Sequence, residues 1–212
     1  MATIHITKGH NIKISGTPEK RVTTLPCPSS IKIVPDNYES VKPKLLIKEG
    51  DEVKIGSKLF FDKNNPSIFF CSPVSGNIRK IKLGDRRKIE EIEISCDNND
   101  TEISKPEINI DTSSSDDIKK ILLDSGLWPS IRQRPFSKIA NPLSTPKSIF
   151  VTAMPTAPFS LDLNFILKDN NDSLKTGFNV ISKLTSGNVN LVLETNKDYD
   201  IFSDTNSVTT HH

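Results

Sequence analysis

Residues 44–94 read KLLIKEGDEVKIGSKLFFDKNNPSIFFCSPVSGNIRKIKLGDRRKIEEIEI, and this stretch decides the fold of the first half of the chain. Short apolar runs, such as Leu59–Phe61 and Ile68–Cys71, alternate with polar turns. Glycines recur at the turns, where a positive φ is needed. Many short strands at close spacing, separated by Gly and Pro turns, are typical of a compact barrel or sandwich.

The segment before this stretch is less regular. Ile4 and Ile6, followed by Ile12 and Ile14, alternate with polar residues around a KGHN turn, which predicts a strand–turn–strand. Residues 23–35, TTLPCPSSIKIVP, carry three prolines and predict an extended connector.

A polar stretch and a short helix follow. Residues 97–117 are predicted to be a linker, and its end is predicted to start a helix. Ser114 or Ser115 is placed to cap that helix, and the next two acidic residues suit the positive end of its dipole. Gly126 is placed just beyond the last helical turn, with Pro129 after it as a stop.

The apolar residues follow a different pattern in the final part of the chain. Residues 148–154, SIFVTAM, predict a buried parallel strand, residues 163–184 a helix, and residues 189–193 a second buried strand. This order is a βαβ unit with a right-handed crossover. One such unit gives a parallel sheet that is too small to stand alone, because both of its faces must be covered. We therefore expect an incomplete α/β domain that is truncated at the C-terminus. His211 and His212 are then native residues.

The loop after the first of these strands argues against a nucleotide site. Residues 152–162, TAMPTAPFSLD, contain no glycine and two prolines. A dinucleotide site needs glycines there, so that free backbone amides can approach a pyrophosphate.

The one tryptophan lies in residues 125–139, SGLWPSIRQRPFSKI. Trp128 and Phe136 are large apolar residues, and Arg132 and Arg134 suit carboxylate or phosphate contacts. Aromatic residues with arginine are typical of interface hot spots. Three interpretations stay open: packing inside the protein, docking on another protein, or a small-molecule site for a quinone or a flavin phosphate.

Composition excludes several classes. A net charge of +2, with scattered lysines, argues against a nucleic-acid binder. The three cysteines lie far apart and form no CxxC pair, so neither a disulfide framework nor a metal cluster is expected. The histidines form no metal-ligand pattern, and no apolar run is long enough to span a bilayer.

Two resemblances follow from these motifs. The pattern from Gly50-Asp51 to Leu59, followed by SPVSG at 72–76, resembles the barrel–sandwich hybrid of biotinyl and lipoyl carrier domains. Those carriers modify a lysine at a hairpin tip, and this chain has Lys63 there, although without the flanking methionines of biotin carriers and with a longer loop up to Ser72. A solvated turn lysine is the other interpretation of Lys63.

The second resemblance covers nearly the whole chain. The stretches KGHNIKISGTPEK at 8–20, SPVSGNIRKI at 72–81, SGLWPSIRQRPFSKI at 125–139 and SIFVTAMPTAPFSLD at 148–162 are similar, in this order, to the A subunit of the bacterial sodium-translocating NADH:quinone reductase. The likeness covers about the N-terminal half of that family's usual length. The family resembles, more distantly, the NADH-binding subunit of respiratory complex I and the C subunit of the Rnf electron-transport complex. In these distant relatives, the segment that matches residues 125–139 is a glycine-rich loop that holds flavin and nicotinamide phosphates. In this chain, Gly126 is the only glycine of that segment.

The resemblance implies the following organisation. A barrel-sandwich hybrid covers residues 1–100, a linker covers 101–117, and an incomplete Rossmann-like α/β domain covers 118–212. The chain is expected to be a cofactor-free accessory subunit with no catalytic or metal-binding residues. It would lie on the cytoplasmic side of the bacterial inner membrane, docked on the membrane-embedded B subunit of a six-subunit complex that couples NADH oxidation and quinone reduction to sodium export. FAD, FMN, riboflavin and iron–sulfur centres are expected in other subunits.

Trp128, Arg132, Arg134 and Phe136 are the residues predicted to contact a partner or a quinone. The alternatives are a contribution to the quinone site of the same complex, or a lipoyl- or biotin-type carrier acting through Lys63.

Overall fold

The computed structural model describes residues 12–104, 106–154, 156–195, 199–202 and 208–211. The contacts within the chain group it into two compact units. The strand-rich unit comprises residues 25–147 and 183–187, and the α/β unit comprises residues 1–24, 148–182 and 188–212.

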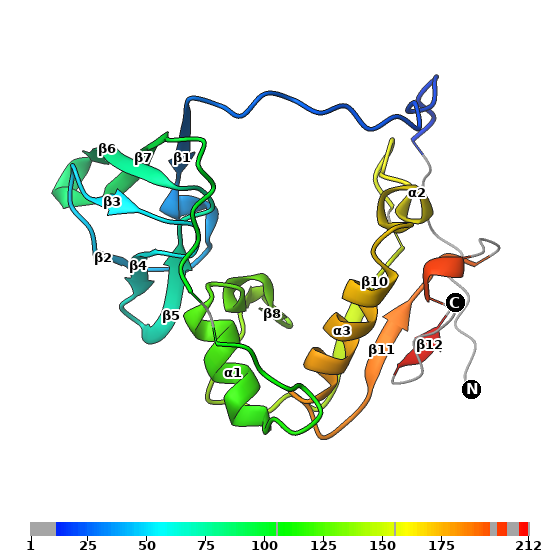
Figure 1. Cartoon of the computed structure of the whole chain (residues 1–212). Coiled ribbons are helices and arrows are strands. Elements are labelled where there is room, and N and C mark those ends of the chain that lie inside the picture. Colours follow the sequence, from blue (N-terminus) through cyan, green and yellow to red (C-terminus); the bar gives the residue numbers. More distant parts are fainter. Residues whose placement is uncertain (1–11, 105, 155, 196–198, 203–207, 212) are drawn as a thin grey trace. The chain divides into compact units, whose positions relative to one another are not determined.

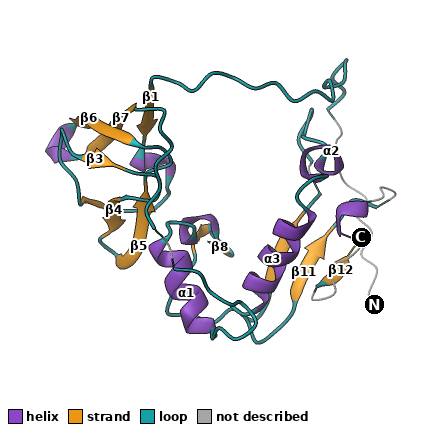
Figure 2. Ribbon diagram, in the orientation of Figure 1, coloured by secondary structure: helices purple, strands orange, loops and turns teal. Residues whose placement is uncertain are grey.

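Two antiparallel sheets build the strand-rich unit (Figures 1 and 2). The first has the order β1-β7-β6-β3 and consists of Ser30–Ile33, Ile89–Cys96, Gly76–Leu83 and Glu52–Val53. The second has the order β2-β4-β5 and consists of Pro43–Leu45, Lys58–Asp62 and Asn65–Cys71. The strands predicted within residues 44–94 are therefore present, with shifted ends.

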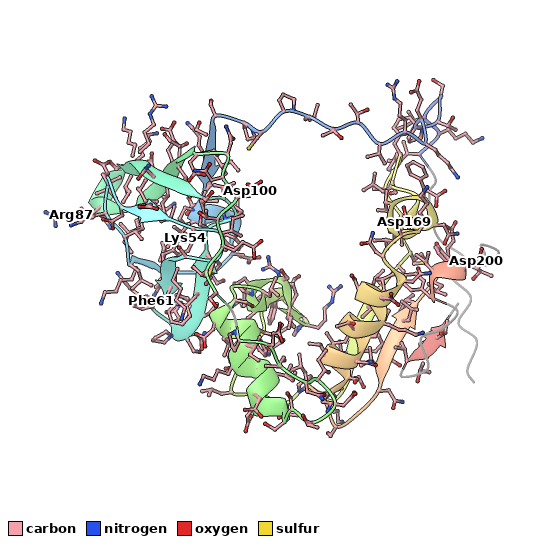
Figure 3. All side chains as sticks on the ribbon, in the orientation of Figure 1. Lys54, Phe61, Arg87, Asp100, Asp169 and Asp200 are labelled. Carbon is pink, nitrogen blue, oxygen red and sulfur yellow. The ribbon has the colours of Figure 1, made fainter. Side chains whose placement is uncertain are left out.

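Alternate side chains along these strands are buried and form one core. Phe60 and Phe70 stack with ring centroids 4.5 Å apart, and Tyr38 meets Phe70 edge-on at 4.6 Å. Ile78, Ile92 and other residues of the first sheet are also buried, whereas turn side chains such as that of Arg87 point outward (Figure 3). Stacked aromatic rings add specific geometry to the hydrophobic burial that stabilises this unit.

The hairpin that carries Lys63 differs from the prediction. β4 and β5 pair down to Asp62 and Asn65, so only two residues form the turn, and the long loop expected up to Ser72 is wrong. The Asp62 carboxylate accepts hydrogen bonds from the amides of Lys42 and Asn64, at 2.9 and 3.0 Å. A side-chain acceptor that satisfies turn amides allows the strands to run further than the turn-rich sequence indicates.

Helix α1 (Ser115–Asp124) belongs to the strand-rich unit, because it packs on β5 and the Lys58 ammonium lies 2.7 Å from the Asp124 carboxylate. The contacts place residues 118–147 in the same compact unit as the strands. A 3₁₀ turn (Trp128–Ser130) and a small hairpin of β8 (Arg132–Gln133) and β9 (Lys138–Ile139) follow α1.

The α/β unit holds a parallel sheet with the order β10-β11-β12, formed by Ile149–Thr152, Val189–Val192 and Thr209–His211. The predicted βαβ order is confirmed, and His211 lies in the third strand, where its ring is 2.9 Å from the Asn190 amide oxygen. β10 is an edge strand, and Phe150 is 67% exposed, so the prediction of a fully buried strand is wrong there.

The helix predicted over residues 163–184 is interrupted. α2 (Leu163–Leu167) and α3 (Asn171–Ser182) are separate, and the Asn170 carbonyl accepts a hydrogen bond from the Leu174 amide at the start of α3. Asn and Asp compete for backbone hydrogen bonds, and the KDNND stretch at 168–172 is therefore a natural break. Phe178 of α3 packs into a core with Val189, Leu191 and Phe202.

The alternation at Ile12 and Ile14 forms no strand, and both side chains are at least half exposed. The strand predicted at these two residues is therefore wrong, because alternation of apolar and polar residues does not by itself make a strand. The first half of that predicted hairpin, at Ile4 and Ile6, lies outside the described residues.

The N-terminus of α1 confirms its predicted cap and has a pH-dependent consequence. Ser114 accepts from the Asp117 amide, while the Asp117 carboxylate accepts from the Ser114 hydroxyl and amide. These hydrogen bonds hold the pKa of Asp117 below its usual value of 3.8. The carboxylate therefore stabilises the folded chain fully above the unfolded-state pKa, about 3.9, and this stabilisation is lost as pH falls through the folded-state pKa.

We expect Asp117→Ala to lower the urea midpoint of unfolding at pH 7, with a deficit that shrinks below about pH 4. The control is Asp116→Ala, because the Asp116 side chain is 94% exposed and lies in the same helical turn. Equal deficits for the two variants across the pH range would contradict the capping role of Asp117.

Candidate functional site: the loop and hairpin after helix α1

The end of α1 is held against β5 by a close backbone approach. Gly126 has a φ of +74°, and a Cβ atom built on it would lie 2.8 Å from the Cys71 Sγ atom and 2.9 Å from its Cβ atom. Only glycine combines this left-handed conformation with this contact. The approach fixes where the chain leaves the helix.

Trp128 is buried directly beyond this point. Its side chain is 3% exposed, and its indole Nε1 donates a 2.8 Å hydrogen bond to the Ala140 carbonyl. This bond joins the start of the loop to the segment that follows β9. Trp128 therefore anchors the hairpin from inside the strand-rich unit, and its position does not suit the predicted contact with a partner or a quinone.

The β8–β9 hairpin projects from this anchor (Figure 2). Arg132 pairs with Ile139 and Gln133 with Lys138, and the Ala140 amide donates to the Ile131 carbonyl at 2.9 Å. The Gln133 side chain accepts from the Asn141 amide at 3.2 Å. Backbone and side-chain bonds thus close the base of the hairpin and leave residues 134–137 as its tip.

The tip and its flanks carry four exposed residues, Arg132, Arg134, Phe136 and Lys138, which we call together the hairpin surface. In the β8–β9 ladder Arg132 lies on the face of Ile139 and Lys138 on the opposite face, with Gln133. Phe136 is 72% exposed, and the Lys138 ammonium lies 5.9 Å from its ring centroid. Among the described residues, no ion pair neutralises these three cations. An exposed aromatic ring with one cation near it, in a hairpin that carries two further cations, suits an acidic partner.

The backbone of the loop is poorly suited to holding a phosphate. The amides of Gly126, Leu127, Ser130 and Ile131 all donate to carbonyls within the loop and the end of α1, at 2.9 to 3.3 Å. Pro129 has no amide hydrogen to donate. A pyrophosphate would have to break these bonds, because such a ligand is held by free amides.

The N-terminus of α2 in the α/β unit is occupied in a comparable way. The Asp162 carboxylate accepts from the Phe165 amide at 3.4 Å and pairs with the Lys20 ammonium at 2.6 Å. An acid already placed at a helix N-terminus disfavours an anionic ligand at that point. This agrees with the absence of glycines in the preceding loop.

The described part of the chain holds no group of three or more His, Cys, Asp or Glu side chains placed to bind a metal ion. No helix among the described residues is long and apolar enough to cross a membrane.

The sequence grouped four residues that the structure separates. Arg132, Arg134 and Phe136 are exposed in the hairpin, whereas Trp128 belongs to the interior. Lys138 was missed, although its position two residues after Phe136 in a short hairpin indicates that they share a face. The role of Gly126 against Cys71 has no sequence signal, since 54 intervening residues separate them.

Comparison with known proteins gives matches over both halves of the chain. Residues 4–97 match a family described as the NqrA N-terminal barrel-sandwich hybrid domain, and residues 113–212 match the NqrA second alpha/beta domain. The predicted fold class, a barrel-sandwich hybrid followed by an α/β domain, is thereby confirmed.

Curated relatives agree with these matches. A protein named as the A subunit of Na(+)-translocating NADH-quinone reductase from Neisseria meningitidis serogroup B is 37% identical over 191 residues, which cover 89% of this chain and 42% of the relative. Proteins of the same name from Pseudomonas aeruginosa strain UCBPP-PA14 and Serratia proteamaculans are each 34% identical, covering 85% and 89% of this chain and 41% and 43% of the relatives. The chain thus spans less than half the length of the relatives it matches.

We expect Gly126→Ala to lower the free energy of unfolding by about 3 kcal/mol, because a left-handed alanine and a side-chain overlap add together. Gly50→Ala is the matched control: its φ is +88° and a Cβ atom there meets nothing within 4 Å, so about 1 kcal/mol is expected. Urea unfolding followed by circular dichroism measures both. Equal losses would show that the Cys71 contact is unimportant.

We also expect the two aromatic residues to behave differently. Trp128→Ala should cost about 3–5 kcal/mol through the cavity it leaves, whereas Phe136→Ala should change stability by less than about 0.5 kcal/mol. The same unfolding measurement applies. A large loss for Phe136→Ala would mean that this ring packs on the protein instead of facing solvent.

Proposed function

The chain belongs to the NqrA family, and on this premise we propose that it acts as the accessory, cofactor-free A subunit of a sodium-translocating NADH:quinone reductase. In this role it contributes to a complex that couples NADH oxidation and quinone reduction to sodium export. The observation that carries the proposal is the match of both domains in order, at 34–37% identity, to proteins of that name. The chain would lie on the cytoplasmic side of the inner membrane and associate there with the membrane-embedded B subunit.

The cofactor-free part of the proposal is supported by the loop after α1. The amides of Gly126, Leu127, Ser130 and Ile131 are already hydrogen-bonded to carbonyls of the loop and the end of α1, and Pro129 has no amide hydrogen. Flavins, iron–sulfur centres and the sodium path are accordingly proposed for other subunits. An absorbance spectrum of the purified chain, together with a titration with NADH, tests this, and stoichiometric flavin or micromolar NADH binding would overturn it.

The hairpin surface is the proposed docking site within the complex. Phe136 offers exposed apolar area at the tip, Lys138 lies near its ring, and Arg132 and Arg134 add positive charge to the same hairpin. Arginine and aromatic residues are enriched among the residues that dominate binding energy at interfaces. We therefore expect the partner to present an apolar pocket with an acidic rim.

Quinone contact is the alternative within the same complex. The burial of Trp128 disfavours a quinone ring stacked on it, so this alternative depends on Arg132, Arg134 and Phe136. Photo-crosslinking of the assembled complex with a quinone azide distinguishes the two. Label on the peptide that carries residues 135–138 favours the alternative, and label confined to other subunits removes it.

A carrier role through Lys63 has one favourable feature and one unfavourable feature. Lys63 is exposed in a two-residue hairpin turn, as in carrier domains. However, its amide donates to the Lys42 carbonyl at 2.8 Å and the Asn64 side chain donates to the Ser40 carbonyl at 3.2 Å, so the turn is held against a neighbouring segment. The test is the intact mass of the chain after purification from cells that contain the attaching ligase. An unmodified mass would rule out the carrier role.

We expect Phe136→Ala and Arg134→Ala each to weaken association with the rest of the complex by about 2 kcal/mol, roughly thirty-fold in the dissociation constant. Copurification of the tagged complex from membranes is the measurement. Leu143→Ala is the matched control, because Leu143 is 91% exposed and lies outside the hairpin. Equal copurification of all three variants with the unaltered chain would refute the docking surface.

A further inference from the structure

The pairing of β1 with β7 brings together two cysteines that lie far apart in the sequence. Ser30 pairs with Ser95, and the Cys96 amide donates a 3.0 Å hydrogen bond to the Ser29 carbonyl, so the ladder continues one residue before β1. Cys27 lies two residues earlier and therefore, in extended chain, on the same side as Ser29. This register places Cys27 diagonally across from Cys96, a position from which side chains meet.

The register therefore brings the two side chains close to one another, and the Cys27 side chain is one of the neighbours that raise the pKa of the Cys96 thiol. Cys27 is exposed and Cys96 is partly buried, and both are free thiols. An accessible thiol beside a second thiol is the usual arrangement of a redox-sensitive pair.

We propose that Cys27 and Cys96 are a site of reversible oxidation, at which a peroxide-class oxidant converts the two thiols into an intramolecular disulfide. The exposed Cys27 sulfur meets hydrogen peroxide first: the O–O bond breaks, an S–O bond forms, and water leaves. The Cys96 sulfur then attacks the Cys27 sulfur, the S–S bond forms, the S–O bond breaks, and the thiol proton leaves with hydroxide as a second water. Two electrons pass from the two sulfurs to the peroxide, and a dithiol reductant reverses the reaction.

The surroundings assign different roles to the two sulfurs. Burial, and then the neighbouring Cys27, Asp97 and Asp100, raise the pKa of the Cys96 thiol. A protonated, sheltered thiol reacts slowly with a free oxidant, which suits the resolving position of the pair. Cys27 lies between Pro26 and Pro28, whose rings favour an extended backbone on both sides of it.

Disulfide geometry requires only a small movement. A disulfide needs Cα atoms about 4.4–6.8 Å apart, and diagonal positions of a ladder are about 7–8 Å apart. Residues 25–28 are exposed, so this segment can shift without disturbing the core. The cross-link would close a loop that contains every strand from β1 to β7 and would restrict the unfolded chain accordingly.

The test is oxidation of the whole chain with hydrogen peroxide, followed by intact mass and non-reducing peptide mapping. We expect a mass lower by two hydrogens and one linked peptide pair that joins Cys27 to Cys96, both reversed by dithiothreitol. Cys27→Ser and Cys96→Ser should abolish the link. Cys71→Ser should retain it, because Cys71 lies against Gly126 and its Sγ atom is 4.0 Å from the Asp124 carbonyl oxygen, away from the pair.

A second readout is independent of the mapping. The oxidised chain should unfold at a higher urea concentration than the reduced chain, and the same treatment should leave the midpoint of Cys27→Ser unchanged. Sulfinic acid on Cys27 with Cys96 unlinked, links between two chains, or links that involve Cys71 would each overturn the proposal.

Discussion

The contact of Gly126 with Cys71 determines the arrangement of everything that follows α1 in the strand-rich unit. A backbone with no Cβ atom, at a φ of +74°, is what allows the end of the helix to lie directly on β5. The Lys58–Asp124 ion pair, at 2.7 Å, lies at the same junction and sets the direction of the helix. Because partly exposed ion pairs contribute little energy, the steric fit at Gly126 is the stronger constraint.

Beyond that junction one aromatic residue is buried and another is exposed. Trp128 enters the interior and ties the segment after β9 through its indole hydrogen bond, while Phe136 remains at the tip of the hairpin. A tip held by a buried anchor loses little conformational entropy on binding, which favours its use as a docking surface. The same folding places the amides of Gly126, Leu127, Ser130 and Ile131 in hydrogen bonds within the loop and the end of α1.

The cysteine pair shows how strand register creates chemistry. Cys27 and Cys96 have no sequence relationship, and the spacing of the cysteines alone argues against a disulfide. The antiparallel ladder between β1 and β7 places them side by side at the edge of the first sheet. The proposed oxidation site therefore depends on the long-range pairing that builds the barrel-sandwich hybrid.

The sequence by itself determined the local features: the strands around Leu59–Phe61 and Ile68–Cys71, the Ser114 cap, the left-handed Gly126 and the βαβ order. These features follow from period, turn chemistry and capping, which act over a few residues. It also indicated the fold class, through motifs in a fixed order. It misjudged Ile12 and Ile14, because alternation carries no information on whether a partner strand exists.

Only the tertiary structure decided that Trp128 is buried while Phe136 is exposed, that Gly126 meets Cys71, and that Cys27 lies close to Cys96. Burial, close approach and the proximity of the two thiols all depend on which distant segments pack together, and that is set by the free energy of the whole folded core, which no short stretch of sequence contains.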